Sequence, residues 1–143
     1  MIIKSIELEN YRNYDNLFIE FDEGTTILTG ENAQGKTNIL EAIYLSSNTR
    51  SHKGSKDNEI VKFDAEEGHI RTILNKNDED LRIDIHLRKG KSKGIALNLE
   101  KLRKASELIG ILNVVGDELK ITIQRMTVVC KMNTLFMLIA VVF

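Results

Sequence analysis

Residues 30–37 constrain the fold of this chain more than any other part of its sequence. They read Gly-Glu-Asn-Ala-Gln-Gly-Lys-Thr and match the pattern G-x-x-x-x-G-K-[ST] at every fixed position. Glycines let the backbone bend closely round an anion, so that its N–H groups point inward. With Gly at about 7% of residues, chance would produce this pattern in roughly one of a few hundred chains of this length. The motif therefore predicts a loop that holds the phosphates of a nucleotide.

The fixed side chains of the motif have separate chemical roles. Lys36 supplies a positive charge to the β- and γ-phosphates, and the Thr37 hydroxyl coordinates Mg²⁺. A helix that begins at Thr37 turns the positive end of its dipole toward the anion. We assign nucleotide binding to the whole loop, which comprises Gly30, Glu31, Asn32, Ala33, Gln34, Gly35, Lys36 and Thr37.

The segments beside the loop have the periodicity that such a loop requires. Residues 25–29 are mostly β-branched, which favours a strand. A helix over about residues 37–45 is indicated by apolar side chains at helical spacing, namely Ile39, Leu40, Ile43 and Tyr44. Further strands are predicted at 2–8, 17–21, 69–74, 81–87 and 95–99, a short helix within 102–109, and turns at 10–16 and 75–80. Strict alternation over 81–87 is typical of a half-exposed antiparallel strand, so we expect an α/β chain with an antiparallel part.

Two acidic or amide-rich segments offer alternative chemistry. Residues 75–78 match N-K-x-D, by which GTPases recognise guanine, but no D-x-x-G element separates them from the loop. A solvated turn between two strands explains this segment better. Asp117 and Glu118 follow the apolar run 111–115, yet Asn113 and Gly116 interrupt the strand that would place them beside a metal. We expect these two carboxylates to face solvent.

The composition limits which cellular compartment and which binding partners are expected. With a net charge of −1, the chain as a whole has no positive electrostatic field that would attract nucleic acid. The single cysteine, Cys130, cannot form an internal disulfide, and the N-terminus lacks the features of a signal peptide. The apolar stretch 134–143 is too short for a bilayer span, which needs about 20 residues. We expect a cytoplasmic protein without a membrane anchor, and 134–143 to be a buried strand or a tail outside the fold.

Positive charges gather in the second half of the chain. Seven lie between residues 88 and 104: Arg88, Lys89, Lys91, Lys93, Lys101, Arg103 and Lys104. They fit either a surface that contacts the phosphates of DNA or an ordinary solvated hairpin and helix. Strong weakening of binding by salt would distinguish the first interpretation.

Beyond the loop motif, several segments resemble the N-terminus of the bacterial RecF family. The longest are Ile3–Tyr14 and Gly30–Tyr44, and the shorter ones are Arg50–His52, Ser106–Gly110 and Leu112–Val115. The resemblance covers residues 1–115. RecF belongs to the SMC-like branch of the ABC ATPases, so the resemblance implies a partial P-loop ABC/SMC-like ATPase head with an antiparallel β-rich subdomain.

The resemblance also implies ligands and partners. ATP would be the nucleotide, and it would drive homodimerisation of the complete head. The DNA ligand would be a gap or a junction between single strand and duplex, and RecO- and RecR-like partners would help to load RecA in replication, recombinational repair and the SOS response to DNA damage. By position, Arg12 and Asn13 match the family's pair beside the nucleotide, although an ordinary polar turn accounts for them equally well. Arg50 is a further candidate for phosphate contact.

After Val115 the chain departs from the family pattern. The family continues into a helical arm, the ABC signature and a strand that carries carboxylates, and residues 116–143 resemble none of these. We therefore divide the chain into a RecF-like part, 1–115, and a divergent tail, 116–143, which truncation or a frameshift would explain. We expect that this chain alone does not hydrolyse ATP and that its fold has low stability. A non-catalytic nucleotide-binding remnant and an unrelated P-loop enzyme remain alternatives.

Overall fold

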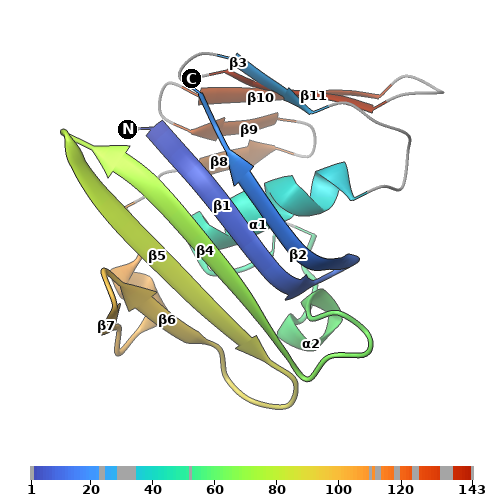
Figure 1. Cartoon of the computed structure of the whole chain (residues 1–143), viewed down its shortest axis with the longest axis vertical. Coiled ribbons are helices and arrows are strands. Elements are labelled where there is room, and N and C mark those ends of the chain that lie inside the picture. The colour runs from blue at the N-terminus through green and yellow to red at the C-terminus, as the bar shows by residue number, and fades with distance from the viewer. Residues whose placement is uncertain are drawn as a thin grey trace.

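Two antiparallel sheets and one long helix dominate the described part of the chain (Figure 1). The computed structural model describes residues 2–22, 25–28, 35–51, 53–109, 111, 114–117, 120–123, 126–132 and 137–142. Helix α1 (Lys36–Asn48) contacts β4 and β5 of the first sheet and β8 of the second. The fold thus places this helix between the two sheets.

The first sheet has six strands in the order β2-β1-β4-β5-β6-β7. Their bounds are β1 Ile2–Tyr11, β2 Tyr14–Glu20, β4 Glu67–Lys76, β5 Glu79–Arg88, β6 Gly94–Leu97 and β7 Glu100–Lys101. Alternation along the strands turns one face inward, where Ile6, Ile70 and Ile85 are fully buried. The same face receives Ile43 and Leu45 from α1, and burying each such side chain contributes roughly 1.5–3 kcal/mol.

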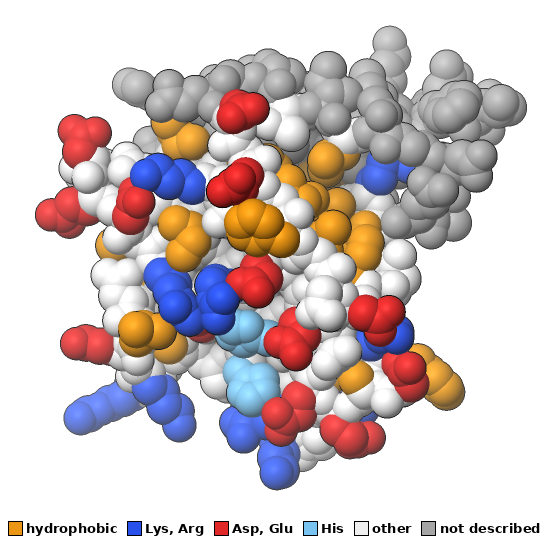
Figure 2. All heavy atoms as spheres, viewed as in Figure 1, with side chains coloured by type: hydrophobic (Ala, Val, Ile, Leu, Met, Phe, Trp, Pro, Cys, Tyr) orange, Lys and Arg blue, Asp and Glu red, His pale blue; other side chains and the backbone are white. Residues whose placement is uncertain are grey.

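The opposite face of this sheet carries interleaved charges. Acidic and basic side chains alternate over it in Figure 2, with histidines near its centre. Asp84 lies in the middle of the network, because its carboxylate accepts hydrogen bonds from Arg71 Nε at 3.2 Å and from Arg82 Nε at 2.6 Å. Burial opposes ionisation of Asp84, but these two arginines outweigh it, so the pKa of its carboxyl lies below its ordinary value.

The hairpin turns are shorter than the sequence suggests. Strands β4 and β5 extend to Lys76 and Glu79, which leaves only Asn77 and Asp78 between them. Both have positive φ, 54° and 63°, the conformation of the two-residue turns that match the twist of a hairpin. The expectation of a turn between two strands is confirmed, and the N-K-x-D segment forms this hairpin.

The helices differ from expectation in extent. Helix α1 continues to Asn48, beyond the predicted end near residue 45, and stops at Thr49, which has φ 59°. The short α2 (Asp57–Ile60) was not predicted. Where a helix was expected within 102–109, only the 3-10 turn η1 (Ala105–Glu107) forms. Within the described part of the chain, none of the helices combines the length and the hydropathy needed to cross a membrane.

The second sheet joins the strand before the loop to the C-terminal part of the chain. Its order is β3-β11-β10-β9-β8, with bounds β3 Thr25–Leu28, β8 Val114–Asp117, β9 Lys120–Ile123, β10 Met126–Met132 and β11 Met137–Val142. Strand β11 pairs with β3 from Ile139 opposite Leu28 to Val142 opposite Thr25. The C-terminal apolar stretch therefore contains a strand, and the burial of its side chains lies outside what the structure describes. Glu118 lies outside the described residues, as do the side chains of Asp117 and Cys130.

Candidate nucleotide site

The described end of the loop motif lies at the N-terminus of α1. Gly35 is the N-cap of the helix with φ 94°, and Lys36 and Thr37 form its first residues. Lys36 is buried and Thr37 is partly buried, and both take part in polar interactions. Gly30, Glu31, Asn32, Ala33 and Gln34 lie outside the described residues. The predicted order of glycine, lysine and helix start is thus present in the structure.

Gly35 packs tightly against the tip of the β1–β2 hairpin. A Cβ atom added to Gly35 would lie 2.6 Å from Tyr14 Oη and 2.7 Å from Asn13 Oδ1, closer than carbon atoms tolerate. The positive φ disfavours any other residue independently. The backbone conformation therefore favours glycine here, and the ends of the Asn13 and Tyr14 side chains at the hairpin tip lie directly against the end of the loop.

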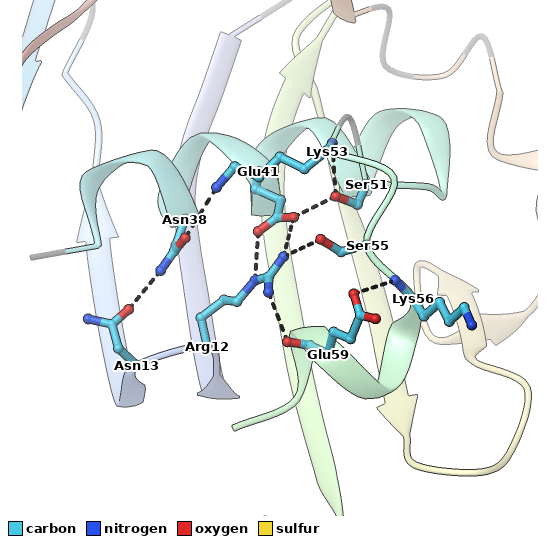
Figure 3. Close-up of polar contacts among 9 residues, drawn as sticks. All are labelled: Arg12, Asn13, Asn38, Glu41, Ser51, Lys53, Ser55, Lys56 and Glu59. Carbon is cyan, nitrogen blue, oxygen red and sulfur yellow. Dashed lines mark hydrogen bonds and ion pairs between the residues drawn. The ribbon is translucent and has the colours of Figure 1, made fainter. Parts of the chain in front are cut away.

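Arg12, at the hairpin tip, is held by an ion pair with Glu41 of α1 (Figure 3). Its Nε and Nη2 donate to the two carboxylate oxygens of Glu41 at 2.9 and 2.6 Å. Nη2 also donates to Ser55 Oγ at 2.7 Å, and Nη1 to the carbonyl of Glu59 at 2.9 Å. The guanidinium thus joins the hairpin to α1, to the loop that follows it and to α2.

Glu41 is a fully buried carboxylate on an otherwise apolar stretch of helix. It accepts a further hydrogen bond from Ser51 Oγ at 2.5 Å. Burial opposes its ionisation, but the hydrogen bonds from Arg12 and Ser51 outweigh burial, so the pKa of the Glu41 carboxyl lies below its ordinary value. In return, the hydrogen bond to Glu41 raises the pKa of Arg12. Both groups are therefore charged at neutral pH.

Asn13 continues the contact to the first turn of α1. Its Oδ1 accepts a hydrogen bond from Asn38 Nδ2 at 2.9 Å, and Asn38 Oδ1 accepts one from Lys53 Nζ at 3.5 Å (Figure 3). The structure thus brings Arg12 and Asn13 to the helix that carries Lys36 and Thr37. Arg50 is exposed in the loop after α1.

Sequence reasoning did not find Glu41, Ser51, Ser55 or Lys53. One signal for Glu41 was available, because an acidic residue among Ile39, Leu40, Ala42 and Ile43 on a packed helix needs a buried partner. Its partner lies 29 residues away, which sequence spacing does not reveal.

A surface hollow opens beside the hairpin tip. It has a volume of about 570 Å³, and its lining includes Arg12, Asn13, Val61, Phe63 and Lys89. Phe63 is 96% exposed, and its carbonyl accepts a hydrogen bond from Lys89 Nζ at 2.8 Å. Among the described residues, no group of three or more His, Cys, Asp or Glu side chains is placed to hold a metal.

Apart from the partly buried Arg88, the basic residues of the second half divide into two groups. Lys89 bonds to the Phe63 carbonyl, and Lys93 forms an ion pair with Asp57 at 2.8 Å. The other group is exposed and comprises Lys91, Lys101, Arg103 and Lys104. Only part of the predicted basic surface is therefore free of protein partners in the described contacts.

Comparison with known proteins agrees with this geometry. The family model described as an AAA ATPase domain matches residues 1–138. The chain belongs to the AAA ATPase domain family. Within it the chain is RecF-like, since it is 63% identical over 115 residues to the DNA replication and repair protein RecF of Agathobacter rectalis. That match covers 80% of this chain and 32% of the relative, so the chain spans about a third of the length of that protein.

Solved structures confirm the expected fold of this RecF-like chain. A structure of the recombination mediator protein RecF with ATP has a TM-score of 0.72 and 38% identity, over 76% of this chain and 30% of that one. A structure described for ATP-driven dimerisation and DNA-stimulated activation of SMC ATPases has a TM-score of 0.70 over 78% of this chain and 77% of that one. Its identity is 22%, so it supports the fold alone. The fold class, a partial ABC/SMC-like ATPase head with an antiparallel β-rich part, is confirmed.

Proposed function

We propose that this chain binds ATP with Mg²⁺ at Gly30–Thr37. The observation that carries the proposal is the support of Gly35 by the hairpin tip, directly before a helix that begins with Lys36 and Thr37. Backbone N–H groups at such a helix start, together with the lysine, suit a polyphosphate. Thr37 would hold Mg²⁺, which would neutralise charge on the phosphates. The family and the RecF structure with ATP support this ligand.

Calorimetric titration with MgATP tests the proposal. Lys36→Ala should weaken binding at least tenfold, because the only fixed cation of the motif is lost. Lys91→Ala is a suitable control, since Lys91 is exposed and lies outside both the motif and the hollow beside the hairpin tip. Equal affinity of wild type and Lys36→Ala would argue against the assignment.

We infer further that the chain derives from a cytoplasmic protein of DNA replication and recombinational repair. Its relatives support this role by name. In the complete head, ATP would drive homodimerisation, DNA gaps or junctions would be the nucleic-acid ligand, and RecO- and RecR-like proteins would cooperate in loading RecA during the SOS response.

We propose that the chain on its own binds ATP without turning it over. Residues 116–143 resemble neither the ABC signature nor the carboxylate strand that would hold the attacking water. Release of phosphate by the purified chain, abolished by Lys36→Ala, would contradict this.

A further inference from the structure

Glu41 and Gly35 are linked through a short chain of contacts. Arg12, which Glu41 holds, directly precedes the two residues that touch Gly35, Asn13 and Tyr14. The backbone of Arg12 is itself in the left-handed region, with φ 54°, and its N–H donates to the Ile60 carbonyl at 2.7 Å. The position of the hairpin tip therefore depends on the contacts that hold the side chain of Arg12.

The number of engaged N–H groups on Arg12 shows how firmly its side chain is held. A guanidinium has five N–H groups. Four of them are engaged: two by Glu41, one by Ser55 and one by the carbonyl of Glu59. Ser51 adds a third hydrogen bond to Glu41, so the carboxylate also ties down the loop after α1. A side chain held on so many sides acts more readily as a fixed support than as a mobile ligand.

We propose that Glu41 is a positioning residue of the nucleotide site. By holding Arg12 it keeps Asn13 and Tyr14 against Gly35, so that the last turn of the phosphate loop has its binding conformation before the nucleotide arrives. This inference rests on the proposed nucleotide binding. It differs from a competing role in which Glu41 withholds Arg12 from the phosphates, because the two roles predict opposite effects of removing the negative charge.

The test compares Glu41→Gln with a matched variant, Asp84→Asn. Both replacements remove a carboxylate paired with arginine, but Asp84 lies on the outer face of the first sheet, away from α1. The 143-residue chain is used throughout. Two quantities are measured: the affinity for MgATP by calorimetry, and the amide hydrogen exchange of residues 35–39 without nucleotide, where the N–H groups of Asn38 and Ile39 bond to the Gly35 carbonyl.

We expect Glu41→Gln to weaken MgATP binding by about tenfold, as loss of a supporting partner commonly does. Exchange at Asn38 and Ile39 should accelerate, while exchange in the core strand β5 stays slow. Asp84→Asn should change neither quantity. Tighter or unchanged ATP binding by Glu41→Gln, or unchanged exchange at Asn38 and Ile39, would overturn the proposal.

Two further outcomes are distinguishable. Where wild type itself fails to bind MgATP, the proposed function is wrong, and the exchange measurement alone still decides whether Glu41 supports the loop. Where Glu41→Gln does not fold, Ser51→Ala replaces it, since this variant removes one hydrogen bond to Glu41 and keeps the ion pair. It should produce a smaller change in the same direction, and no change would overturn the proposal.

Discussion

At Gly35 a conformational restraint and a steric restraint act on one residue. Its φ of 94° disfavours side chains in general, and the hairpin tip occupies the space that a Cβ would need. Gly90 shares the first restraint, with φ 69°, but nothing lies within 4 Å of its missing Cβ. The chain thus offers a pair of glycines in which the two effects can be separated.

Gly35→Ala should lower the free energy of unfolding by more than Gly90→Ala. The left-handed backbone costs both variants about 1–2 kcal/mol, and the contact with Asn13 and Tyr14 adds to the cost only at Gly35. Denaturant unfolding of both variants measures the difference. Equal losses of unfolding free energy in the two variants would show that the side chains of the hairpin tip move aside without cost.

The ion pair at Glu41 makes a second prediction at the residue scale. Because its pKa is lowered by folding, Glu41 contributes stability that is present above its ordinary pKa and is lost as the pH falls through its folded pKa. At neutral pH, Glu41→Gln should cost about 3 kcal/mol, since Arg12 loses its charged partner. The difference between wild type and variant should shrink below about pH 4. Unfolding titrations at a series of pH values measure it, and a constant difference would contradict the assignment.

Among the secondary-structure elements, the β4–β5 hairpin has a turn whose residues only partly suit it. Asn77 and Asp78 both adopt positive φ, and glycine is preferred at the second position of such a turn. Asp78→Gly should therefore raise the free energy of unfolding by up to about 1 kcal/mol. Asp78→Val should lower it, because a β-branched residue tolerates this backbone poorly. Thermal unfolding of the two variants checks both signs.

The elements themselves were predictable to different degrees. Alternation along 81–87 and helical spacing from Ile39 to Tyr44 depend on local burial, and the strand and the helix that they predict are confirmed. The alternation itself is broken at Asp84, which is buried although it lies on the outer face. The end of α1, the existence of α2 and the short turns depend on contacts with distant segments, such as the bond from the Arg12 N–H to the Ile60 carbonyl. The loop motif is contiguous and was therefore recognised from sequence. Its support by Glu41 through Arg12 joins distant segments and was not recognised.

For the whole molecule, the free positive charges decide how DNA could bind. The net charge of −1 gives little general attraction, so contact must come from local groups. Lys101 in β7 and Arg103 and Lys104 just after it are exposed, whereas Lys93 is paired with Asp57. Exposed and paired cations of one chain can therefore be compared directly.

Replacing Lys101, Arg103 and Lys104 together by alanine should weaken binding to gapped DNA and flatten its dependence on salt. Each lost phosphate contact lowers the slope of log K against log salt by about 0.9. Lys93→Ala, the control, should leave the slope nearly unchanged, because its charge is already neutralised by Asp57. Fluorescence anisotropy over a range of salt concentrations measures the slopes, and identical values for wild type and the triple variant would exclude this surface.

The contact between the hairpin tip and Gly35 also gives the protein an optical reporter. The chain contains three tyrosines and no tryptophan, so its ultraviolet emission comes from tyrosine alone. The Tyr14 hydroxyl lies against the end of the phosphate loop at Gly35, and a ligand that displaces this loop should alter the quantum yield of that tyrosine. Occupancy could then be followed without a label, with Tyr14→Phe identifying the signal.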